Sequence, residues 1–506
     1  MLYSRDSVTT MKPILLLLTL LGIAHSQDQK LPNIVFILAD DLGYRELGSY
    51  GQQKIKTPHL DKLASEGMQF MQHYTGAPVC APARCVLMTG KHLAHAEIRG
   101  NRDSGNGRVF PGQWPLTADA VTLAEVLQSA GYATGAFGKW GLGPSNTSGS
   151  PIKQGFDRYF GYNCQRNAHS FYPHFLDSDE REVQINKGLV YGHQHKPSGV
   201  VEADDYRLAN YAPDMILKEA AKFIDAKKDA PFFLYLPFVE PHVSIQSPQE
   251  WIDRYPRAWD FDKGPYRGQN GYIPHPRPRA AYASMISDLD EHVGTILAKL
   301  DEHGLTANTL VVFTSDNGTT HPGKDPKFHI GGVDAEFFNS TGALRGWKGS
   351  VYEGGIRVPC IVKWPGKVAP GSTTETPCYF PDWFPTLCRA ANLTPAADLD
   401  GADLGPMLKG GANPNRHEPM IWEFAGYGGQ VAIRDGAWKA IRQGINRKQP
   451  SPWQLYQIDK DPSESTNIAG QYPDVVTRLE TAYLESRIPE TDFPSRLYDK
   501  SSPATQ

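Results

Sequence analysis

The feature that most constrains the fold is a set of apolar runs that alternate with helical stretches. The first run, NIVFILADD at 33–41, is continuous and ends in two adjacent aspartates. An uninterrupted apolar run of this length is typical of a strand buried on both faces of a sheet. Comparable runs occur at 132–137, 231–239 and 309–315, and helical stretches occur at 57–67, 122–131 and 280–300. This alternation predicts an α/β fold with a large, mostly parallel sheet flanked by helices.

Two of the helical stretches carry start signals. Thr57 precedes Pro58, which suits a first helical position, and we expect the Thr57 side chain to cap the helix. Thr122 and Glu125 have the spacing of a capping box, in which each side chain binds the backbone of the other residue. Both stretches also end in a glycine, as helices commonly do.

The amino-acid composition of the chain changes after about residue 400. The stretch 401–419 is rich in glycine, proline and asparagine, which is typical of a linker. Beyond it, VAIRDGAWKAIR at 431–442 predicts a hairpin around Asp435-Gly436, and WQLYQI at 453–458 predicts a further strand. With a final helix expected over 473–487, the C-terminal part is predicted to be a smaller antiparallel sheet packed with one helix.

The N-terminus has the pattern of a secretory signal peptide. From Met11 the chain has a lysine, an apolar run of about ten residues and a small-residue end at 24–26. The apolar run is too short for a membrane-spanning helix. We therefore expect residues 1–26 to be a signal peptide and the mature protein to be exported, periplasmic or secreted, without stable membrane insertion.

Net charge and cysteine content bear on the partners and on the stabilisation of the chain. The net charge of −4 does not indicate a nucleic-acid partner, and none is expected. Six cysteines in 506 residues do not form a dense disulfide framework, even in an exported protein. Cys378 and Cys388 can pair, whereas Cys85, Cys164 and Cys360 are expected to be buried as small hydrophobic residues.

Polar side chains follow four of the predicted strands, namely Asp40-Asp41, Lys139, His242 and Asp316-Asn317. In a parallel sheet the ligand site lies beyond the carboxyl ends of the strands. The aspartates and the asparagine offer only oxygen ligands, which favours calcium or magnesium over zinc or copper. Adjacent acids at one strand end alternatively cap the next helix. Two such pairs, at two strand ends, favour the metal site.

The stretch GAPVCAPARCVLMTG at 76–90 holds two cysteines whose spacing matches no common zinc or redox pattern. Pro82 suits the first turn of a helix, so Cys80 is expected at a helix N-terminus. Free amides and partial positive charge at that end favour a bound anion. A buried structural thiol is the alternative interpretation of Cys80.

Five motifs together resemble a known family. In order and spacing they match the type I sulfatases of the alkaline phosphatase superfamily: PNIVFILADDLGY, CAPARCVLMTG, GYATGAFGKWGLG, TSDNG and LRGWKGSVYEGGIRVP. The resemblance extends over nearly the whole mature chain, including LYQIDKDPSESTNIA. It implies an alkaline phosphatase-like fold, a sulfuric ester hydrolase activity, and oxidation of Cys80 by a formylglycine-generating enzyme. In that family one hydroxyl of the hydrated formylglycine attacks sulfur and the other then expels the sulfate.

The resemblance also implies roles for individual residues. Lys139 and Lys348 match lysines that bind the sulfate group, and Arg84 would neutralise charge around the formylglycine diol. His242 matches the residue that protonates the leaving alkoxide, a role that suits imidazole near neutral pH. For each lone lysine or histidine, an ordinary surface or core position is the alternative. The implied Ca²⁺ ligands are Asp40, Asp41, Asp316, Asn317 and the modified Cys80.

One position departs from the family pattern. The family often has Gly-Lys-Trp-His-Leu-Gly, whereas this chain has Gly141 where the histidine would be. In the family that histidine handles the diol proton, so its absence implies either an inactive homologue or another base. His95 and His169 are candidates for that base. Together with Arg99 they are also candidates to bind substrate, since their segments combine polar, aromatic and basic residues.

We therefore expect an exported sulfatase that acts on a sulfated saccharide through formylglycine and Ca²⁺. The predicted division is a signal peptide at 1–26, a catalytic domain at 27–410 and a C-terminal subdomain at 411–506. Two alternatives stay open, a phosphate ester hydrolase of the same superfamily and a non-catalytic homologue that binds sulfated glycans. The oxygen-only ligands and Cys80 argue against the first, and Gly141 prompts the second.

Overall fold

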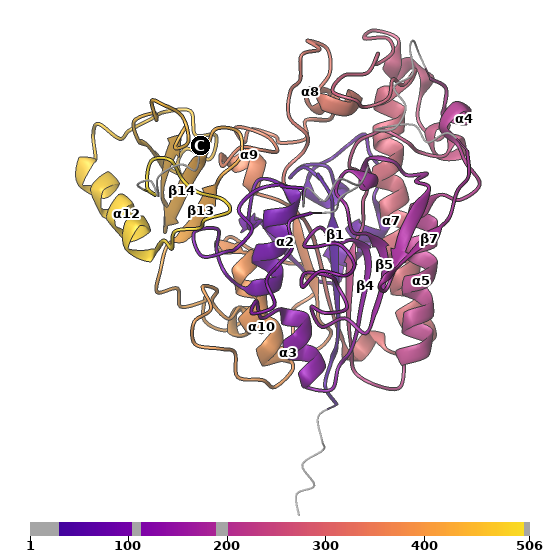
Figure 1. Cartoon of the computed structure of the whole chain (residues 1–506), viewed down its shortest axis with the longest axis horizontal. Coiled ribbons are helices and arrows are strands. Elements are labelled where there is room, and N and C mark those ends of the chain that lie inside the picture. The colour runs from indigo at the N-terminus through magenta and orange to yellow at the C-terminus, as the bar shows by residue number, and fades with distance from the viewer. Residues whose placement is uncertain (1–29, 104–112, 189–200, 500–506) are drawn as a thin grey trace, which may run out of the picture. The chain divides into compact units, whose positions relative to one another are not determined.

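The computed structural model describes residues 30–103, 113–188 and 201–499 (Figure 1). The signal peptide predicted at 1–26 lies outside these residues. From Leu31 onward the chain forms one compact unit, and the domain boundary predicted at 410/411 stays a prediction. Within the described residues, no helix is both long enough and apolar enough to cross a membrane.

A ten-stranded sheet forms the centre of this unit, in the order β11-β2-β10-β9-β1-β8-β4-β5-β6-β7. Its five middle strands are parallel to one another, and antiparallel strands lie toward both edges. This arrangement confirms the predicted α/β fold. The strand bounds are β1 Asn33–Ala39, β2 Met68–Phe70, β4 Ala133–Lys139, β5 Arg158–Tyr162, β6 Phe175–Ser178, β7 Arg181–Gln184, β8 Phe232–Pro237, β9 Thr309–Ser315, β10 Cys360–Lys363 and β11 Ser372–Thr374.

The apolar run of β1 fills two hydrophobic cores, because successive side chains of a strand point to opposite faces. Ile34, Phe36 and Leu38 belong to one core, and the alternate residues of the strand belong to the other. Figure 1 shows α2, α3 and α10 on one side of the sheet and α5 and α7 on the other. The helix bounds are α1 Pro58–Ser65, α2 Cys80–Thr89, α3 Leu123–Ser129, α5 Ala212–Lys227, α7 Pro278–Glu302 and α10 Trp383–Ala390.

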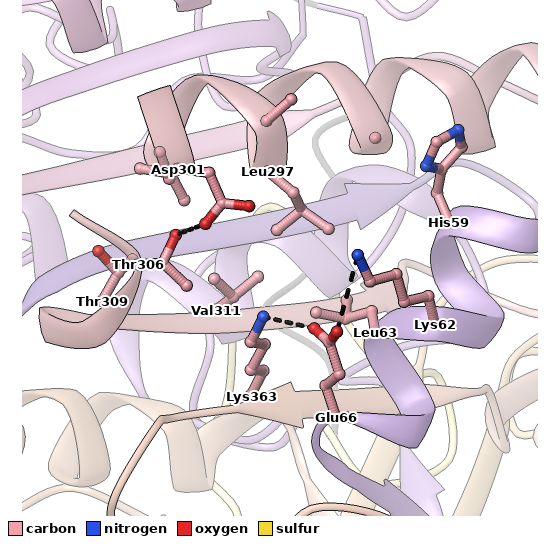
Figure 2. A pocket seen from close by; sticks show the side chains of 13 residues that line it. His59, Lys62, Leu63, Glu66, Leu297, Asp301, Thr306, Thr309, Val311 and Lys363 are labelled. Carbon is pink, nitrogen blue, oxygen red and sulfur yellow. Dashed lines mark hydrogen bonds and ion pairs between the residues drawn. The ribbon is translucent and has the colours of Figure 1, made fainter. Parts of the chain in front are cut away.

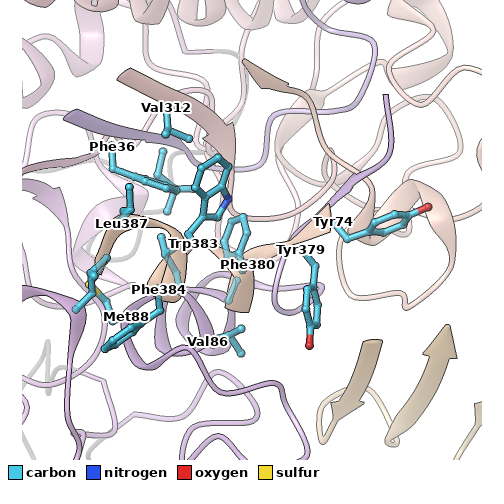
Figure 3. Packing of buried hydrophobic residues seen from close by; sticks show 14 of the residues in the cluster. Phe36, Tyr74, Val86, Met88, Val312, Tyr379, Phe380, Trp383, Phe384 and Leu387 are labelled. Atoms are coloured by element: carbon cyan, nitrogen blue, oxygen red, sulfur yellow. The ribbon is translucent and has the colours of Figure 1, made fainter. Parts of the chain in front are cut away.

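The core around α2 fixes the position of this helix. All ten residues of α2 are buried. Figure 3 shows Val86 and Met88 of α2 close to the aromatic side chains of the segment that contains α10. Trp383 of that helix lies edge-on to Phe36 of β1, with 5.7 Å between the ring centroids. Helix α2 is therefore fixed within the core on this side of the sheet.

The four-stranded antiparallel sheet of the C-terminal part confirms the predicted smaller sheet. Its order is β13-β14-β15-β16, and β14 and β15 form the predicted hairpin. The final helix, α12 (Pro473–Ser486), packs on this sheet. The predicted linker contains a short helix, α11 (Gly405–Leu408). The strand bounds are β13 Met420–Phe424, β14 Gln430–Asp435, β15 Trp438–Gln443 and β16 Gln454–Gln457.

The remaining strands and α-helices of the described residues are short. They are two short strands that pair with each other, β3 (His73–Tyr74) and β12 (Cys378–Tyr379), and four short helices, α4 (Ala203–Tyr206), α6 (Gln249–Ile252), α8 (Ala335–Phe338) and α9 (Glu353–Ile356).

Two local predictions fared differently. The capping box of Thr122 and Glu125 is confirmed. The prediction that Thr57 caps α1 with its side chain is wrong, because its hydroxyl instead accepts a hydrogen bond from the amide of Gly48 at 2.9 Å. The possible Cys378–Cys388 pair is not formed, since both residues are buried thiols, and Cys85, Cys164 and Cys360 are buried as predicted.

Candidate active site

The polar residues predicted at the strand ends lie together. Strands β9, β1, β8 and β4 are neighbours and parallel, and the last residues of β1 and β9, Ala39 and Ser315, are paired in register. The side chains that follow these strands therefore meet at one edge of the sheet. We use the name strand-end cluster for Asp40, Asp41, Cys80, Arg84, Lys139, His242, Asp316, Asn317 and Lys348.

Cys80 is the first residue of α2, as predicted, and is 2% exposed. Its Sγ lies 3.2 Å from Oδ1 of Asp40 and 3.5 Å from Nζ of Lys139. Burial, together with the charges of Asp316 and Asp40, raises the pKa of the Cys80 thiol. The unmodified side chain is thus a protonated thiol that donates to Asp40, and a thiol in that state is a poor nucleophile.

Three basic side chains neutralise the aspartates. Arg84 binds Oδ2 of Asp316 through Nη2 at 2.7 Å and lies 3.4 Å from Asp40, which also pairs with Lys139. Lys348 binds Asp41 at 2.7 Å. Burial opposes ionisation of Asp40, but these cations and His242 hold its pKa well below the usual range. Burial and the neighbouring charge of Asp40 instead raise the pKa of Asp316.

The donor set of the cluster fits a hard divalent cation. Asn317 donates through Nδ2 to Asp41 at 2.7 Å, while its buried Oδ1 has no hydrogen-bond donor among the described residues. Ligand atoms of Asp40, Asp41, Cys80 and His242 lie within 4.8 Å of one another. Carboxylate and amide oxygens are the ligands that Ca²⁺ and Mg²⁺ prefer. The Asp41 backbone is held at φ 68°, an unfavourable conformation that recurs at ligand sites.

His242 lies between Lys348 and a backbone carbonyl. Its Nδ1 is 2.5 Å from the carbonyl of Val243 and must donate there, so its Nε2 faces Nζ of Lys348 at 3.1 Å. Burial and the charge of Lys348 lower the pKa of His242 to about 4. His169 stacks on His242, with 4.9 Å between the ring centroids. His169 also contacts Tyr272, with 5.1 Å between their ring centroids. The structure thus places His169, as well as His242, at the site.

Gly141 lies where another side chain fills the space. A Cβ atom built on Gly141 would lie 2.0 Å from Nε2 of Gln165, and Gly141 has φ 81°. Side chains are disfavoured at such a φ even where room exists. The Gln165 amide is buried beside Gly141, and neither its oxygen nor its nitrogen has a hydrogen-bond partner in the described chain. Nothing in the sequence pointed to Gln165, because its proximity to Gly141 depends on the packing of two separate loops.

His95 and Arg99 are not part of the strand-end cluster. Arg99 is buried, and its guanidinium donates to Glu423 at 3.0 Å and to the carbonyls of Ala94, Ala96 and Ile488. With these donors used inside the protein, the prediction that Arg99 binds substrate is corrected to a packing role. His95 likewise pairs with Asp400 at 2.9 Å and with the carbonyl of Ser486. Both residues follow α2, whose ten residues carry the chain about 15 Å from Cys80.

A cavity of about 200 Å³ lies at a different place on the molecule (Figure 2). It is lined by residues of α1 and α7 and by Thr309 and Val311, which belong to the starting half of β9. Figure 2 shows Lys62 and Lys363 both directed at Glu66 across this cavity. None of the predicted site residues lines it. Glu66 pairs with both lysines, and Thr306 pairs with Asp301. The residues predicted to carry chemistry lie instead in the strand-end cluster.

Comparisons with known proteins cover most of the chain. The sulfatase family model matches residues 32–393, and the model for the C-terminal part of N-sulphoglucosamine sulphohydrolase matches residues 346–488. Arylsulfatase A of Homo sapiens is 31% identical over 94% of this chain and 92% of its own length. Steryl-sulfatase of Mus musculus is 30% identical over 81% of this chain and 70% of its own length. The crystal structure of Ps i-CgsB in complex with k-i-k-neocarrahexaose is 28% identical, with a TM-score of 0.70, and covers 89% of this chain and 91% of its own.

Proposed function

Since this chain belongs to the sulfatase family, whose members hydrolyse sulfuric esters, we propose that it removes sulfate from a saccharide with a formylglycine made from Cys80. Two observations support a saccharide substrate. One matching family model is named for an N-sulphoglucosamine sulphohydrolase. One similar structure is a complex with k-i-k-neocarrahexaose.

The observation that carries the proposal is the state of Cys80. The side chain lies at the start of a helix, between Asp40 and Lys139, in an environment that keeps the thiol protonated. A thiol held in this way does not supply an effective nucleophile. A formylglycine at this position would supply, when hydrated, a geminal diol with one hydroxyl for attack on sulfur and a second that expels the sulfate. The formylglycine-generating enzyme is then the partner that matures the chain.

A calcium ion would be held by Asp40, Asp41, Asp316, Asn317 and the formylglycine made from Cys80. The buried amide oxygen of Asn317, which has no donor in the described residues, supports this assignment. Bound calcium would supply Lewis-acid polarisation of a sulfate oxygen and would lower the pKa of a neighbouring hydroxyl. Arg84 holds Asp316 in place through two nitrogens, so it positions one of these ligands.

Lys139 and Lys348 would bind the sulfate group. Both ammonium groups lie in the cluster, on either side of the Asp40–Asp41 pair. Fixed positive charges stabilise the negative charge that develops on sulfate oxygens in the transition state. Their positions are already set by ion pairs with the aspartates, so little reorganisation accompanies binding.

His242 would protonate the leaving alkoxide. Its Nδ1 proton is committed to the carbonyl of Val243, so any proton that it transfers resides on Nε2. In the structure burial and Lys348 keep the imidazole neutral. A sulfate anion beside the ring favours the imidazolium and raises the pKa toward neutrality. The proton would therefore be present on Nε2 when substrate is bound.

Export is also proposed for the mature protein, on the basis of the signal-peptide pattern at 1–26. An exported enzyme would meet sulfated polysaccharides outside the cell, which agrees with the proposed substrate class.

The proposal is tested first by mass spectrometry of the peptide that contains Cys80, from protein made in its natural source. We expect the aldehyde or its hydrate at residue 80 and an unmodified thiol at Cys85. Cys80→Ala should abolish hydrolysis of an aryl sulfate, and Cys85→Ala is the matched control that should keep it. An unmodified thiol at Cys80 in the natural protein would contradict the proposed formylglycine mechanism.

Activity assays separate the alternatives. We expect an aryl sulfate with Ca²⁺ to be hydrolysed in preference to an aryl phosphate with Zn²⁺. The opposite preference would favour a phosphate ester hydrolase. Binding of sulfated oligosaccharides without turnover, by protein that carries the modification, would favour a non-catalytic homologue.

A further inference from the structure

The loop between β13 and β14 holds an exposed aromatic side chain in an unfavourable backbone conformation. Tyr427 has φ 53° and is 57% exposed. A positive φ is a steric outlier for a bulky residue. Eight described residues other than glycine have a positive φ, and seven of them are asparagine, aspartate or glutamate. Tyr427 is the only aromatic residue among these eight.

Specific contacts hold the Tyr427 ring. A Cβ atom built on Gly349 would lie 2.2 Å from Cε2 of Tyr427, so the ring packs directly on the backbone of that glycine. Phe424 and His321 lie edge-on to the ring, with centroid distances of 5.7 and 5.8 Å. The neighbouring residues 426, 428 and 429 are all glycines. The loop is therefore shaped around this one side chain, more than half of which is nevertheless exposed.

These contacts place Tyr427 beside the strand-end cluster. Gly349, on which the ring packs, directly follows Lys348, and its amide donates to the carbonyl of Pro78 at 2.7 Å. Pro78 lies two residues before Cys80. On the other side of Lys348, its Nζ lies 3.1 Å from Nε2 of His242, which stacks on His169, and His169 in turn contacts Tyr272. Tyr427 and Tyr272 are therefore two aromatic groups of the same site.

We propose that Tyr427 is the stacking surface for the saccharide ring that carries the sulfate ester. This inference rests on the proposed function. The C–H face of a pyranose ring is apolar and packs on an aromatic face, while its sulfate group reaches the adjacent Lys348. The position suits that role, because the ring packs on the residue that follows Lys348 and is largely exposed.

The backbone conformation gives the proposal a second, independent support. Glycine or asparagine at position 427 would occupy this conformation at lower cost. The tyrosine at this position is 57% exposed, so burial of its side chain does little to offset the cost of the conformation. Outliers of this kind persist at ligand sites because the side chain is needed there.

The test compares Tyr427→Asn with Tyr427→Phe and the wild type, all carrying formylglycine. Asparagine tolerates the positive φ, whereas phenylalanine keeps the ring and the strain. For Tyr427→Asn we expect kcat/KM on a sulfated oligosaccharide to fall about tenfold or more, mainly through KM, which matches the usual contribution of one aromatic contact. The same variant should have a higher Tm than the wild type. Tyr427→Phe should keep the wild-type kcat/KM within about threefold and the wild-type Tm.

Inorganic sulfate can bind the strand-end cluster but has no saccharide ring to stack on residue 427. Its inhibition of the enzyme should therefore be equal in all three proteins. An unchanged KM for the oligosaccharide in Tyr427→Asn would overturn the inference. A parallel loss of sulfate inhibition and of oligosaccharide turnover in this variant would also overturn it, because the strand-end cluster itself would then be disturbed. If the wild type does not hydrolyse any sulfated saccharide, the proposed function fails instead, and the two failures are thereby distinguished.

Discussion

Two buried networks of acidic and basic residues in this molecule differ in how their charges are satisfied. One is the strand-end cluster. The other, the Glu353 cluster, consists of Glu353, Lys439 and Glu464, with Tyr74 and Arg434 beside them. Lys439 binds Glu353 at 2.8 Å and Glu464 at 2.9 Å, and the hydroxyl of Tyr74 donates to Glu353 at 2.7 Å. Each of these carboxylates is thus paired with groups of the protein itself.

The aspartates of the strand-end cluster are ion-paired as well, but this cluster also holds a buried amide oxygen without a donor in the described residues. Its lysines point at the same edge of the sheet, the Oδ1 of Asn317 has no donor in the described chain, and Asp41 has a strained backbone. The Glu353 cluster joins α9 to β15 and to the loop after β16. The comparison teaches that buried charge serves ligand binding where polar groups are left for a ligand, and serves packing where the groups neutralise one another.

The first prediction compares Lys139→Met with Lys439→Met, which remove one buried lysine from each cluster. Lys139→Met should lower kcat/KM for an aryl sulfate by about 10³-fold, because a fixed charge that stabilises the transition state is lost. Asp40 keeps its contact with Arg84, so the variant should stay folded. Kinetics and circular dichroism on both variants check this. If Lys439→Met lowers kcat/KM by the same factor, the two clusters do not differ in their contribution to catalysis.

The second prediction concerns the stability of Lys439→Met. Removing this lysine leaves Glu353 and Glu464 facing each other without their shared cation, and the free energy of unfolding should fall by about 3–5 kcal/mol. Urea unfolding measures the change. Adding Glu353→Gln and Glu464→Gln to the same protein removes the unpaired charges and should restore most of the loss. If Lys439→Met and the wild type have the same urea midpoint of unfolding, the ion pairs of Lys439 do not stabilise the fold.

The third prediction is an effect of calcium removal on the strand-end cluster alone. A ligand that binds only the folded protein, present at 100 times its Kd, stabilises it by about 2.7 kcal/mol. Chelation should therefore lower the Tm of the wild type and of Glu353→Gln. In Asp40→Asn the Tm should not respond to calcium. A calcium response that survives in Asp40→Asn, or one that is absent from the wild type, contradicts the proposed metal site.

The sequence predicted one of these clusters and not the other. Asp40, Lys139 and Asp316 could be predicted to meet because each follows a continuous apolar run, and parallel strands bring their carboxyl ends to one edge. The three charged residues of the Glu353 cluster lie in separate segments with no common pattern. These residues come together only because the four-stranded sheet packs against the rest of the chain. No periodicity in the local sequence predicts that packing.

The same reasoning explains the misplacement of Arg99. This residue is close to Cys80 in sequence, but a rigid helix intervenes and carries it to Glu423. Tyr427 was missed for the opposite reason, since it is distant in sequence and is brought to Gly349 only by tertiary packing. Chemistry at strand ends is therefore predictable from local pattern, whereas contacts between segments that are distant in sequence are not.

The last and smallest prediction is the pH dependence of the Glu353 cluster. Burial raises the pKa of Glu464 to about 7, and Lys439 and Arg434, acting against burial, lower the pKa of Glu353 to about 2. Between pH 5 and 7 the unfolded chain has both glutamates ionised, while folded Glu464 still binds a proton. The folded state therefore binds more protons in this window, and the contribution of Glu464 to stability decreases as the pH rises.

Glu353 contributes in the opposite direction and in a different window. Its contribution is complete above pH 5 and is lost only as the pH falls toward 2, so it does not mask Glu464 between pH 5 and 7. Other acids titrate in that window too, so the measured quantity is the difference in unfolding free energy between the wild type and Glu464→Gln at pH 5.5 and at pH 7.5. We expect the wild type to lose about 1–2 kcal/mol relative to the variant between these values. A difference that is independent of pH would show that Lys439 keeps Glu464 ionised throughout this range, and the predicted uptake of a proton by folded Glu464 would be wrong.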